Sequence, residues 1–521
     1  MPADRWRDVT TLVDLLAARG RDDPRRAAFT FEGRAVSFGE LWDDAGRFAS
    51  LLARRGLEGG ARVLLALPNG REFFAAFYGV LRAGGVAVPL FPGSGRERTA
   101  RLARLCGASA LVVPASAAAD PDAGVDVVRV ADADGCPAAG DSAVVRPRDV
   151  AFLQYTSGST GDPKGVELRH ANLIANVRQL VAGFGVTADD VFVSWLPVHH
   201  DMGLILMTLV PFYAGAELVL LPTSLANVRP WLAAIAERRG TFTAAPDFAW
   251  RMLLRYAREP ERYDLSSLRV ALNAAEPVRA RTIADFERTF SLGPVTIAGY
   301  GLAEATVGVS AWPPGTPPKV DARGFVSIGK PFPGVDMAIL AAGELAGAGV
   351  EGEILVRGPA TSRGYFRNPE ATAKLYWRHG YLRTGDLGYF DDDGDFFVVG
   401  RAKNVILHGG RNLAPQEVEE IVDRLDAVRA SAAVGIDRGR LDGEQVYVFA
   451  EARRPGAVDG AELVRTIVER LHGELGLRPA RVFVLRPGAL PRTANGKLRH
   501  GELRSRYLEG ALKELVLFPV W

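Results

Sequence analysis

The stretch TSGSTGDPKG, residues 156–165, is dense in glycine and hydroxyl side chains and ends on a lysine and a glycine. Glycines allow backbone conformations closed to other residues, so successive amide N–H groups can converge on an anion, while Ser and Thr hydroxyls add donors. A Walker loop would follow its lysine with Ser or Thr, whereas Lys164 stands between Pro163 and Gly165. The run therefore predicts a phosphate-binding loop of a different nucleotide chemistry, with an ordinary surface turn as the alternative.

The segments that lead up to this loop alternate between strand and helix patterns. Apolar runs at Val63–Leu67 and Val86–Leu90 flank a helical pattern over Arg71–Arg82, and a strand at Val150–Tyr155 ends where the loop begins. Such alternation indicates an α/β fold, with a mostly parallel sheet covered by helices on both faces. The loop then lies at the carboxyl end of a strand, where open α/β sheets bind ligands.

The composition limits the number of domains, the kinds of binding partner and the cellular compartment that can be expected. The chain has 521 residues, 48% of them hydrophobic, which is too many for one ordinary core, so two or more domains are expected. Its net charge of +2 argues against nucleic acid or an anionic membrane as a partner. Cys106 and Cys136 support neither a disulfide framework nor a thiolate metal site, and the N-terminus shows no export signal, so a cytoplasmic protein is expected.

The most apolar stretch, Leu204–Pro222, raises the question of a membrane span. Pro211, Gly215 and Glu217 interrupt it before the roughly 20 residues that a spanning helix needs. We expect a buried helix, a turn and a buried strand instead. The apolar C-terminus, Val516–Trp521, receives no assignment from its pattern.

Six further motifs follow along the chain: WLPVHHDMGLI (195–205), NAAEP (273–277), GYGLAEAT (299–306), YLRTGDLGYF (381–390), VVGRAKNVILHGGRN (398–412) and LPRTANGKLRH (490–500). Together with the phosphate loop, this series resembles the adenylate-forming superfamily, which includes acyl-CoA synthetases, fatty acyl-AMP ligases, peptide-synthetase adenylation domains and luciferases. The resemblance covers nearly the whole chain. Its motifs are most similar to those of fatty acyl-AMP ligases, which share the HDMGLI form and have Ala303 where much of the superfamily has threonine.

The resemblance implies a division of the chain into domains. A large N-terminal domain is expected over residues 1–400, with mostly parallel sheets covered by helices and a β-rich subdomain. A hinge is expected over residues 401–403, with Lys403 at the pivot, and a small mobile C-terminal α+β lid over residues 404–521.

For the nucleotide, the resemblance implies three catalytic residues: Lys497, which bridges the substrate carboxylate and the α-phosphate of ATP, Glu304, which holds Mg²⁺, and His200. A carboxylate oxygen is a hard ligand of the kind that Mg²⁺ prefers. Tyr300 offers a flat face to adenine, and Asp386 offers a carboxylate to both ribose hydroxyls. The full ATP- or AMP-binding set is Thr156, Ser157, Gly158, Ser159, Thr160, Gly161, Lys164, Asn273, Ala274, Ala275, Glu276, Gly299, Tyr300, Gly301, Leu302, Ala303, Thr306, Asp386 and Arg401.

For the acid, the resemblance places His200 where relatives have an aromatic gate beside the reacting carboxylate. A hydrophobic substrate tail is expected, in an acyl pocket made of His200, Asp201, Met202, Met207, Phe248 and Gly299. Two alternatives stay open for the histidines: ligation of a metal by His199 and His200, and plain core packing.

The implied reaction is ATP-dependent activation of a hydrophobic, fatty carboxylic acid to acyl-AMP with release of pyrophosphate, then transfer to the phosphopantetheine thiol of an acyl carrier protein in lipid or polyketide assembly. Fatty acyl-AMP ligases carry an insertion associated with rejection of CoA, whereas only the short segment Val307–Ser327 follows the 299–306 motif here. An acyl-CoA synthetase that uses free CoA therefore remains the alternative. A luciferase-like oxygenase shares the fold, and the intact Lys497, Asp386 and Glu304 argue against a catalytically inactive nucleotide-binding regulator.

Overall fold

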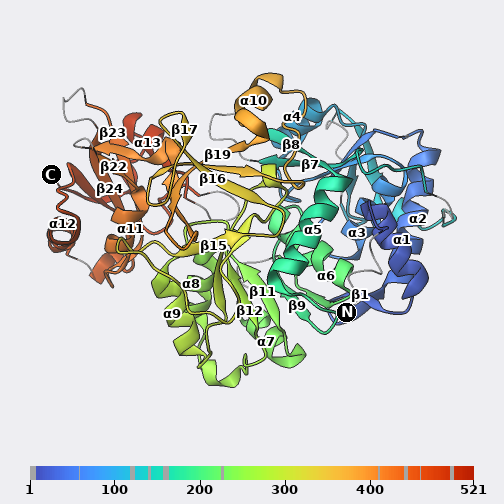
Figure 1. Cartoon of the computed structure of the whole chain (residues 1–521), viewed down its shortest axis with the longest axis horizontal. Coiled ribbons are helices and arrows are strands. Elements are labelled where there is room, and N and C mark those ends of the chain that lie inside the picture. The colour runs from blue at the N-terminus through green and yellow to red at the C-terminus, as the bar shows by residue number, and fades with distance from the viewer. Residues whose placement is uncertain are drawn as a thin grey trace.

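The computed structural model describes residues 8–57, 59–117, 124–138, 142–156, 163–223, 228–408, 411–438, 444–457, 459–492 and 498–520 (Figure 1). Ser157 to Gly161 of the phosphate loop and Lys497 lie outside these residues. The last part of the chain, drawn in orange and red, lies at one end of the molecule, and the N-terminal helices lie at the other (Figure 1).

A six-stranded sheet carries the first part of the chain. Its order is β6 (Asp126–Arg129), β5 (Ala110–Val113), β3 (Arg62–Leu65), β4 (Val86–Pro89), β7 (Val150–Thr156) and β8 (Lys164–Arg169). Its neighbours are parallel except β7 and β8, which pair antiparallel with Thr156 opposite Lys164. The predicted strand before the phosphate loop is confirmed, and the loop connects two paired strands.

The helices of this part of the chain have the amphipathic patterns expected for a covered sheet. They are α1 (Leu12–Asp22), α2 (Phe38–Arg54), α3 (Arg71–Arg82), α4 (Arg96–Cys106) and α5 (His170–Phe184). The Ser37 side chain accepts the Glu40 amide and the Glu40 side chain accepts the Ser37 amide, which fixes the start of α2. Helices α2 and α3 approach closely at Gly79, where a Cβ would lie only 2.6 Å from the Phe48 Cβ.

A second sheet of fourteen strands runs through the middle of the molecule (Figure 1). Strands β13, β12, β11, β9, β10 and β1 are parallel neighbours, and the edge strand β2 and the strands from β14 onward are antiparallel. The strands that sequence analysis expected in a β-rich subdomain therefore continue the parallel sheet through β14. In sheet order the strands are β17 (Glu344–Leu345), β16 (Asp336–Ala341), β18 (Gly352–Arg357), β19 (Leu382–Phe390), β20 (Phe396–Arg401), β15 (Ser327–Pro331), β14 (Ser310–Ala311), β13 (Thr296–Tyr300), β12 (Val270–Asn273), β11 (Phe242–Ala245), β9 (Val191–Ser194), β10 (Glu217–Leu220), β1 (Ala27–Phe31) and β2 (Arg34–Ser37).

Further helices accompany this sheet, and its most apolar connection is folded as predicted. The stretch from Leu204 to Pro222 begins inside a π-helix (Met202–Leu209), continues into α6 (Val210–Ala214) and ends after β10. Within the described residues, no helix is long and apolar enough to cross a membrane. The remaining helices before the C-terminal part are α7 (Val228–Arg238), α8 (Asp247–Tyr256), α9 (Ala280–Thr289) and α10 (Pro369–Leu375).

The C-terminal part has its own sheet and its own buried clusters. Strands β23 (Val428–Ile436), β24 (Gln445–Ala452), β25 (Arg481–Leu485) and β26 (Val516–Val520) form the sheet, and helices α11 (Pro415–Asp423), α12 (Gly460–Leu475) and α13 (His500–Leu508) accompany it. A short hairpin, β21 (Ile406–His408) and β22 (Arg411–Leu413), precedes it. Val516 pairs with Leu485, so the apolar C-terminus is an edge strand. The α/β fold class is confirmed.

Candidate active site

The candidate site lies at the carboxyl ends of two adjacent parallel strands, β12 and β13. Strand β13 extends from Thr296 through Tyr300, so Gly299 and Tyr300 belong to the sheet. At Gly301 a Cβ would lie 1.6 Å from the Val307 carbonyl oxygen, and only glycine fits there. Ala275, after the end of β12, has a φ of 72°, a left-handed conformation that a non-glycine residue rarely adopts. Both loops are therefore held in specific conformations.

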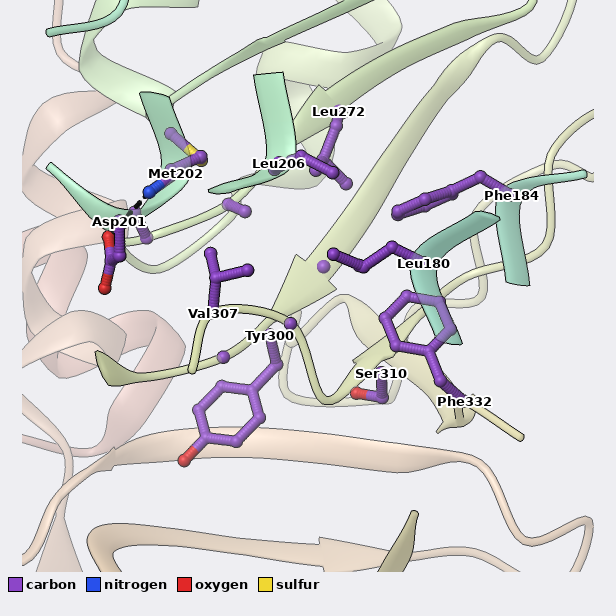
Figure 2. A pocket seen from close by; sticks show the side chains of 15 residues that line it. Leu180, Phe184, Asp201, Met202, Leu206, Leu272, Tyr300, Val307, Ser310 and Phe332 are labelled. Carbon is purple, nitrogen blue, oxygen red and sulfur yellow. Dashed lines mark hydrogen bonds between the residues drawn. The ribbon is translucent and has the colours of Figure 1, made fainter. Parts of the chain in front are cut away.

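An apolar cavity of about 70 Å³ lies against these strand ends (Figure 2). Of the predicted residues, Asp201, Met202, Ala274, Ala275, Gly299, Tyr300 and Gly301 line it. Its far wall consists of Leu180 and Phe184 from α5 together with Phe332, which sequence reasoning missed. The buried face of α5 is a signal for Leu180, but nothing in the local sequence places Phe332 opposite that helix. The cavity is short, and its aromatic end is closed.

Three residues predicted for the acyl pocket, His200, Met207 and Phe248, do not line this cavity. Met207 is completely buried in the core, and the cavity is lined by its neighbour Leu206 instead. Phe248 lines a different cavity, next to α11, and its backbone amide donates to the Glu276 carboxylate. Helical direction explains the errors at Met207 and Phe248, because adjacent residues on a helix point to different faces.

The two adjacent histidines have separate environments. His199 is partly buried with its ring 5.5 Å from that of Phe91, and burial, together with the nearby His200 and Arg98, lowers its pKa to about 3. His200 does not line the cavity, and its Nδ1 lies 2.6 Å from Asp201 Oδ1. Among the described residues the histidines join no cluster of three metal-ligating side chains. His199 therefore packs as a neutral, partly buried side chain against Phe91, whereas His200 is held by Asp201, which lines the cavity.

Tyr300, Asp386 and Arg401 form one polar group on the outer side of the cavity. The Tyr300 hydroxyl donates to Asp386 Oδ2 over 2.7 Å, and Arg401 Nε lies 2.7 Å from Asp386 Oδ1. Asp386 is nearly buried, and Asp386 and Arg401 are paired residues of β19 and β20. Burial and then Asp386 raise the pKa of Tyr300, while Asp386 raises the pKa of Arg401. The carboxylate is therefore held from two sides.

A second polar group brings Glu304 close to the end of the phosphate loop. The Tyr365 hydroxyl donates to Glu304 Oε1 over 2.7 Å, and Lys164 Nζ lies 5.0 Å from the centre of the Tyr365 ring. Burial and Glu304 raise the pKa of Tyr365, so the phenol remains a donor. Sequence analysis did not identify Tyr365, because this tyrosine lies outside the family motifs and the residues around it do not indicate a contact with Glu304.

Several predicted nucleotide contacts are directed into the protein. The Asn273 amide is buried and donates to Asp247 Oδ1 over 3.0 Å, and the Thr306 hydroxyl is fully buried and donates to the Ala360 carbonyl over 2.6 Å. Ala303 is buried, and Leu302 packs at the edge of an apolar cluster. In these positions the Asn273 and Thr306 side chains are bonded within the protein and shape the loops.

The C-terminal part approaches the same site. Lys403 follows β20 directly, and its pKa is lowered by burial and by Arg401. His500, three positions after Lys497, lies with Nε2 2.6 Å from Glu419 Oε1. Burial lowers the pKa of His500, but the nearby Glu419 carboxylate raises it by more, so the pKa is raised overall. The motif that carries Lys497 is thus held to α11 through His500.

Side chains suited to a nucleotide lie at strand ends next to an apolar cavity, and this arrangement is typical of an α/β enzyme that brings a nucleotide and an apolar substrate together. Residues 16–366 match the family model described as AMP-binding enzyme, and the chain belongs to that family.

The chain is similar over most of its length to named ligases. It is 31% identical to the medium-chain-fatty-acid–acyl-carrier-protein ligase JamA of Moorena producens, covering 97% of this chain and 96% of that protein. It is 29% identical to the long-chain-fatty-acid–AMP ligase FadD26 of Mycobacterium marinum, covering 97% and 98%. A structure from studies of fatty acyl-adenylate ligases of E. coli and L. pneumophila has a TM-score of 0.86 at 28% identity, covering 98% and 99%.

Proposed function

We propose that this enzyme activates a hydrophobic carboxylic acid with ATP to form an acyl adenylate, releases pyrophosphate, and passes the acyl group to the phosphopantetheine thiol of an acyl carrier protein. The observation that carries the proposal is the apolar cavity that ends at Tyr300 and Gly301, in the loop that also carries Glu304. An apolar tail in that cavity places its carboxylate beside the residues suited to the nucleotide.

The chemistry joins two anions, because the acid carboxylate attacks the α-phosphate of ATP. The protein must therefore align the two groups and neutralise charge. Asp386, fixed by Tyr300 and Arg401, is suited to accept both ribose hydroxyls. We assign charge neutralisation to Lys164 at the end of the phosphate loop and to Lys497 between the carboxylate and the α-phosphate.

Glu304 fits a divalent cation on the triphosphate. Its Oε1 is oriented by the Tyr365 hydroxyl, and within the described residues Oε2 accepts no hydrogen bond. A single carboxylate combined with phosphate oxygens is the ligand set that Mg²⁺ usually takes in nucleotide sites. Mg²⁺ bound there would neutralise phosphate charge during the displacement.

The acceptor thiol is proposed from the relatives. The family implies an acyl acceptor thiol, and JamA is named for transfer to acyl-carrier protein. The JamA alignment extends over 573 positions, more than the 521 residues of this chain, so that relative has residues this chain lacks. The missing residues are consistent with the short segment Val307–Ser327, where fatty acyl-AMP ligases carry the insertion associated with rejection of CoA. Free CoA is therefore the competing acceptor.

The division into moving parts is also a proposal. We assign residues 1–400 to the large domain, 401–403 to the hinge and 404–521 to the lid. The separate sheet and clusters of the C-terminal part support this division. A rotation about Lys403 would withdraw Lys497 after adenylate formation and admit the thiol, so one site would serve both half-reactions.

The test measures pyrophosphate release over a panel of carboxylic acids with ATP and Mg²⁺, followed by mass analysis with either CoA or a phosphopantetheinylated carrier protein. Lys497→Ala should abolish pyrophosphate release and leave ATP binding largely intact, whereas Lys513→Ala, an exposed lysine of the same C-terminal part, should behave as wild type. Pyrophosphate release that survives in Lys497→Ala contradicts the assignment. Efficient acyl-CoA formation without carrier loading would establish the competing acceptor.

A further inference from the structure

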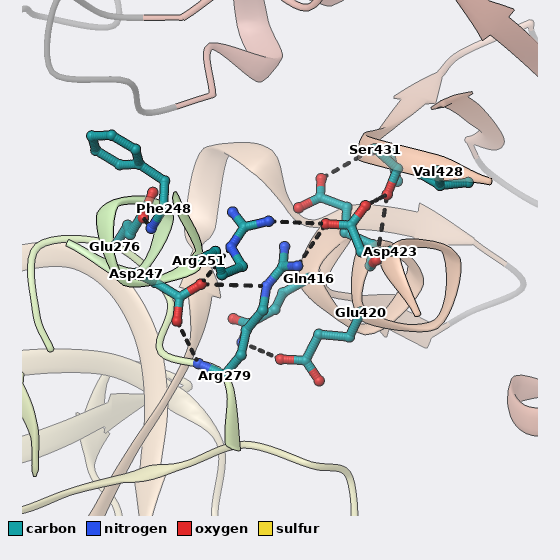
Figure 3. A network of polar contacts seen from close by, with 12 residues as sticks. Asp247, Phe248, Arg251, Glu276, Arg279, Gln416, Glu420, Asp423, Val428 and Ser431 are labelled. Atoms are coloured by element: carbon teal, nitrogen blue, oxygen red, sulfur yellow. Dashed lines mark hydrogen bonds and ion pairs between the residues drawn. The ribbon is translucent and has the colours of Figure 1, made fainter. Parts of the chain in front are cut away.

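We propose that Arg279 and Asp423 form a latch that holds the C-terminal part of the chain in the orientation seen in the structure, and we assign that orientation to adenylate formation. Arg279 immediately precedes α9, and Asp423 is the last residue of α11. Arg279 Nη1 lies 2.6 Å from Asp423 Oδ2, and both side chains are largely buried, with 16% and 7% exposed (Figure 3). The inference rests on the proposed function because it assigns Lys497 to adenylate formation.

The latch is supported from the large-domain side by Asp247. This carboxylate is 1% exposed and lies between two arginines: its Oδ2 is 3.0 Å from Arg251 Nε and 3.8 Å from Arg279 Nε (Figure 3). Arg251 Nη1 also approaches Asp423 Oδ2, at 3.8 Å. Two carboxylates thus alternate with two guanidinium groups, so each buried charge has an opposite charge beside it.

Asp247 also connects the latch to the loop predicted to bind nucleotide. Its Oδ1 accepts the Asn273 amide over 3.0 Å and the Arg279 backbone N–H over 3.3 Å. Asn273 is the last residue of β12 and the first of the NAAEP loop. The same carboxylate that orients Arg279 therefore fixes the start of that loop, which explains why the Asn273 side chain is directed inward.

On the lid side, α11 carries the latch and also holds the segment next to Lys497. Asp423 Oδ1 accepts the Ser431 hydroxyl over 2.7 Å, which ties the end of α11 to β23. One turn earlier on α11, Glu419 Oε1 contacts His500 Nε2 at 2.6 Å. Because one helix makes both contacts, a change in the position of Asp423 against Arg279 is passed on to His500, which is three positions after Lys497 in the sequence.

The interface beside the latch is open. A cavity of about 610 Å³ separates α8 and α9 from the C-terminal part, and Arg251, Arg279 and Asp423 are in its lining. Packing alone therefore does not fix the orientation there, and the charge pair supplies the directional contact. Asp423 is consequently a positioning residue, which acts on the reaction through α11 and does not touch substrate.

The first experiment separates the two half-reactions in the full-length protein. Asp423→Asn should slow pyrophosphate release by about tenfold or more, the effect expected from breaking a close charge pair. Transfer from supplied acyl-AMP to the carrier thiol should not fall, because that step requires the latch to open. Asp423→Glu should restore adenylate formation, and Asp426→Asn, which removes an exposed carboxylate from the same cavity wall, should match wild type.

The second experiment measures orientation without substrate. Gly293→Cys and Gly473→Cys place labels on exposed glycines of the two parts, where an added Cβ meets nothing within 4 Å, while Cys106 and Cys136 are buried. The distribution of energy transfer between the labels should shift in Asp423→Asn and return in Asp423→Glu.

An unchanged distribution together with wild-type pyrophosphate release in Asp423→Asn would overturn the latch. Parallel loss of both half-reactions without rescue by Asp423→Glu would also overturn it, since that pattern indicates general destabilisation. If the wild-type protein releases no pyrophosphate with any acid, the proposed function fails, yet the label measurement still decides whether the latch sets the orientation.

Discussion

Replacing Leu180 with alanine should lengthen the acid that the enzyme prefers. Leu180 lies on α5, is 1% exposed, and closes the cavity together with Phe184 and Phe332. The cavity is small, about 70 Å³, and we expect the wall that contains Leu180 to limit the length of the acid. Removing Cγ, Cδ1 and Cδ2 of Leu180 opens space in line with the substrate tail, enough for about two to three methylenes on the scale of buried CH₂ groups.

The size of the shift follows from the transfer free energy of the added methylenes. Each buried methylene contributes about 0.8 kcal/mol, so two to three of them favour the longer acid by about 2 kcal/mol. That difference corresponds to a roughly 30-fold change in the ratio of kcat/KM between the longer and the shorter acid. The cavity left in the free protein lowers the free energy of unfolding by about 2–5 kcal/mol.

The assay is pyrophosphate release over straight-chain acids of increasing length. Leu173→Ala is the matched control, because Leu173 is fully buried on the same helix and does not line the cavity. Both variants should lose comparable stability in thermal unfolding, but only Leu180→Ala should change the preferred length. A Leu180→Ala enzyme that retains activity with the wild-type length profile would refute the assignment of this wall.

Two further changes probe the fold around the site. The Leu12 amide donates to buried His170 Nδ1 over 3.1 Å, and burial lowers the pKa of His170 from 6.5 to about 4. As the pH falls, the unfolded chain protonates His170 before the folded protein does, so the free energy of unfolding should be highest above pH 6.5 and fall by about 3 kcal/mol as the pH drops to 4. Denaturant unfolding at each pH measures this change. His170→Gln should reduce the dependence of the free energy of unfolding on pH, and an unchanged dependence would contradict the assignment to His170. Gly301→Ala forces a Cβ to 1.6 Å from the Val307 carbonyl oxygen and should abolish ATP binding measured by calorimetry, whereas Gly293→Ala, with open space around it, should bind normally; equal binding by both would show that the loop tolerates displacement.

Hydrophobic pattern alone predicted much of the fold. The helix at Arg71–Arg82 has the predicted bounds, because a 3.6-residue period depends only on local sequence. The way in which β14 joins the parallel strands to the antiparallel ones could not be predicted. Strand β14 has only two residues and so shows no hydrophobic pattern, and its pairing with β13 on one side and β15 on the other is long-range.

The candidate site was predictable at the level of segments and less so at the level of side chains. The motifs after β12 and β13 lie together because parallel strands end at one edge of a sheet. Asp386 and Arg401 lie on the antiparallel strands β19 and β20, so their contact with Tyr300 depends on long-range pairing. Side-chain direction depends on packing partners far along the chain. Phe248 and Met207 were therefore assigned to the wrong surroundings, and Tyr365 was missed although it holds Glu304.

The continuity of the fourteen-stranded sheet has a mechanical consequence. Tyr300 on β13 and Asp386 on β19 belong to one uninterrupted hydrogen-bonded ladder, and Arg401, opposite Asp386, is the last residue of β20. The sheet therefore fixes Tyr300, Asp386 and Arg401 relative to one another, and the chain leaves the sheet directly after Arg401. A change in the backbone dihedral angles of the residues after Arg401 would reorient the C-terminal part of the chain. The distance between the Tyr300 hydroxyl and the Asp386 carboxylate would stay constant.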